Sequence, residues 1–136
     1  MGQTDEGPWE LRDVATVADV AAIVEQFYED MESDHVIGRF FVGLDWTTHL
    51  PRMNAFWSAT VFQTGAYHGR PLELHAALDG LDADHFARWL QRWRNTVDVL
   101  FAGERAELMK TRAEQIGGIF QVKLGIYPDP ISYPRP

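Results

Sequence analysis

The sequence contains no cysteine. Disulfide bonds, thiolate nucleophiles, zinc–thiolate sites, iron–sulfur clusters and cofactors attached through cysteine are therefore excluded. The sequence also lacks any apolar run that approaches the roughly 18 residues of a membrane span. Residues 1–12 show no basic region followed by an apolar one, as a secretion signal would. These features predict a cytoplasmic protein that has no membrane partner.

Basic residues are few. Twelve lysines and arginines stand against 20 aspartates and glutamates, which gives a formal net charge of −8. A surface of this sign repels the phosphates of nucleic acids and of anionic lipids. We therefore expect no nucleic-acid partner.

Familiar catalytic motifs are missing as well. The five histidines follow no zinc-ligand spacing, no H-E-x-x-H motif occurs, and a Glu-x-x-His pair occurs only once, at Glu32 and His35, where a di-iron bundle needs two. A zinc hydrolase and a di-iron helical bundle are therefore poorly supported. The sequence also contains no P-loop and no G-x-S-x-G nucleophile turn.

Apolar and aromatic residues, by contrast, are plentiful: they make up 46% and 12% of the 136 residues. A chain of this length and composition can bury one sizeable core, which predicts a single domain. We place that domain at residues 16–126, after an N-terminal tail of residues 1–15. Four prolines within residues 127–136 prevent regular structure, so we interpret this stretch as a C-terminal tail.

Helical periodicity dominates between the tails, and no convincing alternating strand is seen, which predicts an all-α fold. Thr16 and Asp19 have the spacing of a capping box at the start of a first helix that extends to Met31. A single helical turn is expected at residues 37–41. A second helix is expected to begin near Thr47 or Thr48, with Pro51 in its first turn. The predicted inward side chains of that helix are His49, Met53, Phe56, Trp57 and Thr60.

Three further helices are expected in the second half of the chain. A short one opens at Pro71, the next begins around Asp82 or Asp84, and the last follows Gly103. The apolar face of the short helix carries Leu74, His75 and Leu78. The expected inward residues of the two long helices are Phe86, Trp89, Leu90, Trp93, Val97, Leu100, Met109, Ala113, Ile116 and Phe120.

His49 and His75 are the two histidines on apolar helix faces. Taken alone, either one is more often a half-buried core residue with a satisfied hydrogen bond than a ligand. Haem needs little more than one neutral imidazole and a wide apolar slot, and the aromatic residues supply suitable walls. The same aromatic residues also make an ordinary core, so periodicity by itself leaves both interpretations open.

Taken together, four segments in order closely resemble the truncated haemoglobins, in particular group III of that family. The resemblance extends from about Val17 to Gly125 and implies a two-over-two helical sandwich around haem b. The segments that carry it are Phe27-Tyr28, Trp46 to His49 leading into Phe56-Trp57, Gly69 to Pro71 followed by Leu74-His75, and Phe86 to Leu90.

The resemblance implies specific roles for individual residues. His75 is similar to the proximal iron ligand, Tyr28 to the main distal hydrogen-bond donor, and Trp89 to the distal tryptophan of this group. His49 resembles the distal histidine, and Phe41 a phenylalanine that lies against the haem. The other residues expected around the haem or its ligand are Phe27, Met53, Phe56, Leu74, Leu78, Phe86 and Trp93. Candidate partners of the haem propionates are Arg52, Arg70, His68 and Arg94.

The function expected from this resemblance is binding of oxygen, and of other diatomics such as NO or CO, at a five-coordinate haem iron. One alternative on the same scaffold is a haem enzyme with peroxidase-like or nitric oxide dioxygenase activity. A second alternative is a helical interaction module without a cofactor. A haem protein would also need a reductase, which the sequence does not identify, and we expect a monomer or a weak homodimer.

Overall fold

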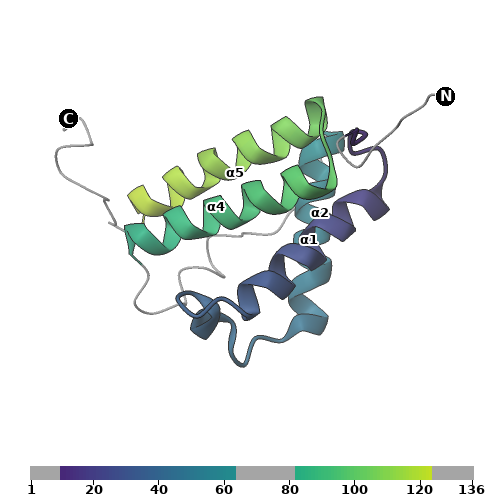
Figure 1. Cartoon of the computed structure of the whole chain (residues 1–136). Coiled ribbons are helices and arrows are strands. Elements are labelled where there is room, and N and C mark those ends of the chain that lie inside the picture. The colour runs from purple at the N-terminus through teal and green to yellow at the C-terminus, as the bar shows by residue number, and fades with distance from the viewer. Residues whose placement is uncertain (1–9, 64–81, 124–136) are drawn as a thin grey trace, which may run out of the picture.

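The computed structural model describes residues 10–63 and 82–123, and these residues form helices and connecting turns without a strand. The elements are α1 (Val17–Glu32), the 3-10 turn η1 (Gly38–Phe41), α2 (Trp46–Phe62), α4 (Ala83–Leu100) and α5 (Glu104–Lys123). Helices α4 and α5 lie side by side in one layer, and α1 and α2 form the other (Figure 1). This arrangement confirms the all-α prediction. No helix in the described ranges is long and apolar enough to cross a membrane.

Helix α1 begins where the sequence predicted. The Thr16 hydroxyl accepts the N–H of Asp19 at 3.1 Å, and the Asp19 carboxylate accepts the N–H of Thr16, which completes the capping box. Asp19 also accepts two hydrogen bonds from the Arg12 guanidinium, each 2.8 Å long. The side-chain bond from Arg12, followed by the N–H of Ala15, holds the pKa of Asp19 well below its usual range. The carboxylate therefore stays ionised and keeps the first turn of α1 in place.

Helix α2 begins one or two residues earlier than predicted, at Trp46. Asp45 is its N-cap and accepts the N–H of Thr47 and the hydroxyls of Thr47 and Thr48. Pro51 consequently lies in the second turn of α2, so its expected place in the first turn was wrong. Because proline has no N–H, the Thr47 carbonyl cannot receive the usual helical hydrogen bond from this position.

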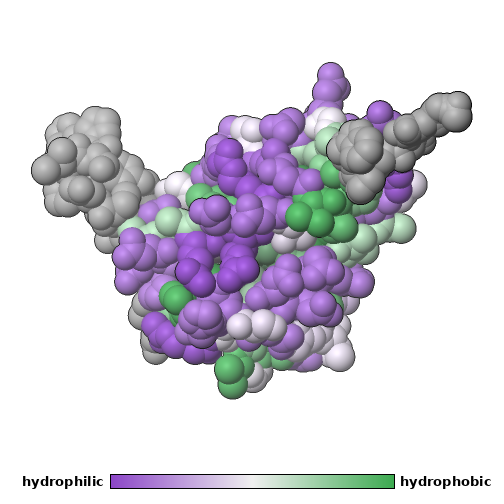
Figure 2. Space-filling view, in the orientation of Figure 1, coloured by the Kyte–Doolittle hydropathy of each residue, from purple (hydrophilic) through white to green (hydrophobic). Residues whose placement is uncertain are grey.

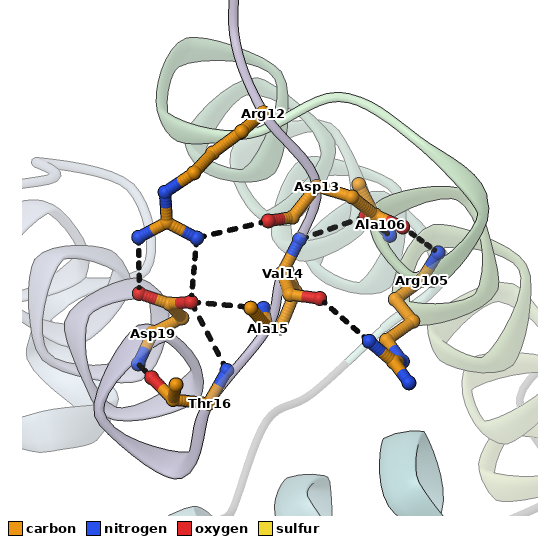
Figure 3. Close-up of polar contacts among 8 residues, drawn as sticks. All are labelled: Arg12, Asp13, Val14, Ala15, Thr16, Asp19, Arg105 and Ala106. Atoms are coloured by element: carbon orange, nitrogen blue, oxygen red, sulfur yellow. Dashed lines mark hydrogen bonds and ion pairs between the residues drawn. The ribbon is translucent and has the colours of Figure 1, made fainter.

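Residues 10–15, which we had placed in the N-terminal tail, pack against the corner between α4 and α5. Val14 is fully buried, and the Asp13 carboxylate accepts the N–H groups of Arg105 and Ala106 at 2.9 Å (Figure 3). Asp13 thus caps the first turn of α5 from a distant part of the chain. Gly103 permits the close approach: it has a φ of 145°, and a Cβ atom there would lie 2.4 Å from the Asp13 Cγ.

The core lies between the two helical layers and centres on two tryptophans. Trp57 of α2 stacks on Trp93 of α4 with ring centroids 4.5 Å apart. The Trp93 indole N–H donates to the Met109 carbonyl at 3.1 Å and so ties α4 to α5. The other fully buried large side chains around this pair are Phe27, Ile23, Met31, Met109, Val14, Val20, Val24 and Val97.

Candidate functional site

Tyr28 is the centre of an aromatic cluster that draws on three elements. Its ring makes edge contacts with Phe41 of η1, with Trp46 at the start of α2, and with His49 one turn later. The centroid distances are 5.8 Å, 5.4 Å and 4.9 Å respectively. Phe41 and Trp46 stack on each other at 6.2 Å, and Trp46 meets His49 at 5.8 Å. These four side chains, Tyr28, Phe41, Trp46 and His49, are called the Tyr28 cluster below.

Burial controls the chemistry of Tyr28. Its side chain is only 5% exposed, and this desolvation raises the pKa of the phenol above its ordinary value. The phenol therefore keeps its proton across the physiological pH range. A protonated phenol in a buried aromatic setting is a hydrogen-bond donor of fixed position.

His49 is buried on α2, 7% exposed, with its ring against Tyr28 and Trp46. The structure thus brings together two residues that the resemblance had linked, a phenol and an imidazole from different helices. Pro51 follows His49 closely in the sequence, and His49 nevertheless lies on the inward face of α2.

A second group of aromatic rings adjoins the Tyr28 cluster through Phe27. Phe27 is fully buried and contacts Tyr28 at 4.9 Å, Trp93 at 4.9 Å and Trp89 at 6.1 Å. Trp93 was expected to line the cofactor site, and its indole N–H is committed to Met109 in the core. Trp89 is half-buried beside Gly117 of α5, where an added Cβ would lie 3.7 Å from its ring. Trp89 also packs against the core, and its side chain is half-buried where that of Trp93 is fully buried.

The remaining expected pocket residues fall into two groups. Met53 and Phe86 are buried, and Phe56 is half-buried against Trp57. His75, Leu74 and Leu78 lie outside the described residues, so their assignments remain predictions. Two of the candidate propionate partners, His68 and Arg70, lie there too.

The other two candidate propionate partners are on the described surface. Arg52 is exposed on α2. Arg94 of α4 forms an ion pair with Glu114 of α5, and both side chains are about half exposed. Arg94 is therefore already engaged by a carboxylate of the chain itself.

The sequence analysis gave no role to Asp34. This residue joins the turn between α1 and η1 to helix α4. The Asp34 side chain is completely buried between the end of α1 and α4. It accepts the N–H groups of Val36 and Ile37 just before η1, at 2.8 Å and 3.1 Å. It also accepts from Arg88 and Arg92 of α4 at 2.7–2.9 Å. Phe41, which contacts Tyr28, ends the turn that Asp34 anchors.

Burial alone would raise the pKa of Asp34. The N–H groups of Ile37 and Val36, together with the two guanidinium groups, outweigh that effect and hold the pKa well below its usual range. Asp34 therefore stays ionised at neutral pH and links α1, η1 and α4. The two arginines stand four residues apart on one face of α4, and this spacing is a sequence signal for a shared acidic partner. It does not say which carboxylate fills that role.

Comparisons of the sequence and of the structure with known proteins both match a group III truncated haemoglobin. No protein-family profile matches the sequence. The chain is 27% identical over 114 residues to the group 3 truncated haemoglobin of Campylobacter jejuni, covering 79% of this chain and 90% of the relative. The crystal structure of a group III truncated haemoglobin from Campylobacter jejuni superposes with a TM-score of 0.75 at 25% identity. That match covers 88% of this chain and 97% of the solved one.

The two helical layers, and their match to a truncated haemoglobin structure over most of the chain, define a truncated globin fold. Within that class, the chain is related to the group III truncated haemoglobins, as its sequence segments predicted. Tyr28 and His49, to which the resemblance gave distal roles, lie together in the described structure with Phe41, which the resemblance placed against the haem. Trp46 is a further member of the cluster, and the sequence had included it only as part of a segment.

Proposed function

We propose that this chain binds haem b and that Tyr28 donates a hydrogen bond to a diatomic ligand in the haem pocket. The sequence match and the structure match that cover most of the chain are both to a group III truncated haemoglobin of Campylobacter jejuni, a name that implies a haem cofactor. Haem, when bound, supplies the iron to which oxygen, NO or CO attaches. The rest of the proposal concerns what the residues of this chain contribute.

The Tyr28 cluster fits one wall of such a pocket. A haem slot needs a mostly apolar lining with a small number of placed polar groups, and the cluster offers two aromatic walls, one phenol and one imidazole. Its members come from α1, η1 and α2, so the packing of three elements fixes their mutual positions. The phenol of Tyr28 stays neutral at physiological pH because burial raises its pKa, and a neutral donor suits a neutral gas.

The observation that carries the proposal is the protonated, buried phenol of Tyr28 beside the His49 imidazole. Oxygen held by a ferrous haem would carry partial negative charge, and a hydrogen bond to a charged acceptor contributes about 1.5–3 kcal/mol. That range corresponds to roughly ten- to a hundredfold in affinity. Tyr28 would therefore slow ligand release, and a half-buried Trp89 N–H would offer a second donor.

His75 is proposed as the residue that would hold the haem iron, and the Tyr28 cluster as the wall that would meet the gas. The assignment rests on its place in the resemblance, after Gly69 to Pro71 and beside Leu74. Because the chain has no cysteine, haem would be held without a thioether link. An external reductase would be needed to keep the iron ferrous.

The test is a haemin titration of the purified full-length chain, followed by optical absorption, for wild type, His75→Ala and His35→Ala. His35 is exposed in the turn after α1 and serves as the matched control. We expect wild type and His35→Ala to bind one haem each and to give a five-coordinate ferrous spectrum, and His75→Ala to lose that spectrum. An unchanged ferrous spectrum in His75→Ala would reject His75 as the ligand. Absence of any haem band in wild type would reject the proposal as a whole.

A further inference from the structure

A polar hollow lies on the outer face of α4. None of its described lining residues belongs to the aromatic Tyr28 cluster. Its volume is about 370 Å³. At roughly 30 Å³ per liquid water, this leaves room for a small ion and several waters. In the view of Figure 2, hydrophilic residues cover most of the face to which α4 and α5 contribute. The described residues that line the hollow are Ala87, Arg88, Gln91, Arg92 and Asn95.

The lining is unusual for so acidic a chain because the described residues in it include two arginines and two amides and no carboxylate. Guanidinium and amide groups donate N–H bonds in several directions. Asp30 lines a neighbouring hollow beside Arg92, and its carboxylate accepts a bond from Gln26. The side chains around the first hollow therefore favour an acceptor that carries negative charge.

Asp34 orients both guanidinium groups from beneath. It takes the Nε edge of Arg88, at 2.9 Å and 2.8 Å, and the Nε and Nη2 atoms of Arg92, at 2.9 Å and 2.7 Å. Within the part of the chain that the structure describes, these bonds leave both terminal nitrogens of Arg88, and Nη1 of Arg92, for other acceptors. The two arginine side chains are 36% and 38% exposed, so these ends can reach solvent.

The buried carboxylate also reduces the entropy that a ligand would have to overcome. A free arginine side chain loses rotamer entropy when it is fixed, and its planar fork loses less per bond once it is oriented. Arg88 and Arg92 are already held by Asp34 in the absence of any ligand. The single negative charge of Asp34 neutralises only one of the two guanidinium charges. One net positive charge from these three side chains therefore remains at the hollow.

We propose that this hollow, named the α4 anion site, binds a phosphate group through the outward ends of Arg88 and Arg92. A phosphate has three or more acceptor oxygens in a tetrahedral array, which can accept from both forks and from the Gln91 and Asn95 amides at once. A planar carboxylate can satisfy only one fork fully. The site does not depend on haem, so it stands or fails separately from the function proposed above.

The test follows backbone amide NMR shifts of the full-length chain during titration with inorganic phosphate, with sodium chloride at matched ionic strength as the reference. Gln91→Glu adds a carboxylate to the hollow and leaves the contacts of Asp34 untouched. Gln115→Glu makes the same change on the exposed face of α5 and is the matched control. Arg88→Gln removes one fork.

We expect saturable shifts for residues 87–95 in wild type and in Gln115→Glu. Gln91→Glu should weaken phosphate binding about fivefold or more, because a like charge at contact distance in water costs about 1 kcal/mol. Arg88→Gln should abolish saturation, and Gln91→Glu keeps the test valid if Arg88→Gln does not fold. Equal shifts with chloride, or equal affinity in the two glutamate variants, would overturn the proposal. Binding of acetate as tight as that of phosphate would overturn the assignment to a phosphate group.

Discussion

Tyr28 and His49, from helices α1 and α2, place their rings edge to face with centroids 4.9 Å apart. Twenty residues, which include the whole of η1, separate them in the sequence. Their contact sets a phenol donor and an imidazole side by side on one buried wall. The proposed gas chemistry depends on that pair.

Replacing Tyr28 by phenylalanine removes the donor and keeps the ring. We expect oxygen to dissociate at least about tenfold faster from the haem-loaded variant, because one hydrogen bond to a charged acceptor is lost. The wild-type dissociation rate should stay flat as pH rises from neutral to mildly alkaline, because burial raises the pKa of the phenol and keeps it protonated. Stopped-flow mixing measures both. An unchanged off-rate in Tyr28→Phe would show that another group holds the ligand.

His49→Ala tests whether the imidazole controls ligand access or holds the iron. Because His49 lies against Tyr28 on the proposed distal wall, we expect the rate of CO association to change by severalfold while haem content stays at one per chain. Flash photolysis gives the association rate, and absorption gives the haem content. Loss of haem in His49→Ala, together with retention in His75→Ala, would mean that the roles of the two histidines are reversed.

Asp34→Asn should destabilise the fold by about 3 kcal/mol, because it breaks a buried ion pair. This value is at the lower end for such a change, since both arginine partners are partly exposed and can be solvated when the carboxylate is lost. Urea denaturation measures this change. Asp30→Asn is the control, since Asp30 bonds an exposed glutamine, and its effect should stay within about 0.5 kcal/mol. Similar values for both variants would contradict the anchoring role of Asp34.

Asp34 also predicts the sign of a pH effect. Its pKa is lower in the folded chain than in the unfolded one, so its stabilising contribution is complete above the unfolded value of about 3.9. That contribution is lost as the pH falls through the lower, folded value. Wild type should therefore lose more stability on acidification than Asp34→Asn does. A steeper loss in the variant would give the wrong sign for this account.

Asp13→Ala removes the distant cap of α5 and should destabilise the chain by about 1–2 kcal/mol. Gly103→Ala should act on the same contact, because its Cβ would collide with Asp13 and its φ of 145° disfavours any side chain. The double variant is therefore expected to lose less than the sum of the two single losses. Thermal denaturation of the four proteins gives the comparison, and strict additivity would show that the two residues act independently.

Local signals in the sequence predicted the helices well. Thr16 with Asp19, and Asp82 at the start of α4, are capping residues whose effect depends only on neighbours within one turn. Asp45 was missed as the cap of α2, since the threonines after it looked equally suitable. That choice moved the helix start and placed Pro51 in the second turn.

Contacts between distant segments could not be predicted in the same way. Asp34 meets Arg92 across 58 residues, and Asp13 meets Ala106 across 93. Many carboxylates in this acidic chain could have paired with those groups, and only the folded backbone selects among them. The meeting of Tyr28 with His49 was anticipated only through the resemblance, because helical periodicity places both on inward faces without saying that the faces adjoin.

The infrared spectrum of the CO complex tests the central claim most directly, because the C–O stretching frequency reports hydrogen bonding to the bound gas. Wild type should give a C–O band that shifts clearly to higher frequency in Tyr28→Phe, as the donor is lost. Absence of a haem–CO band in wild type, or a band at the same frequency in both proteins, would contradict a haem pocket walled by Tyr28.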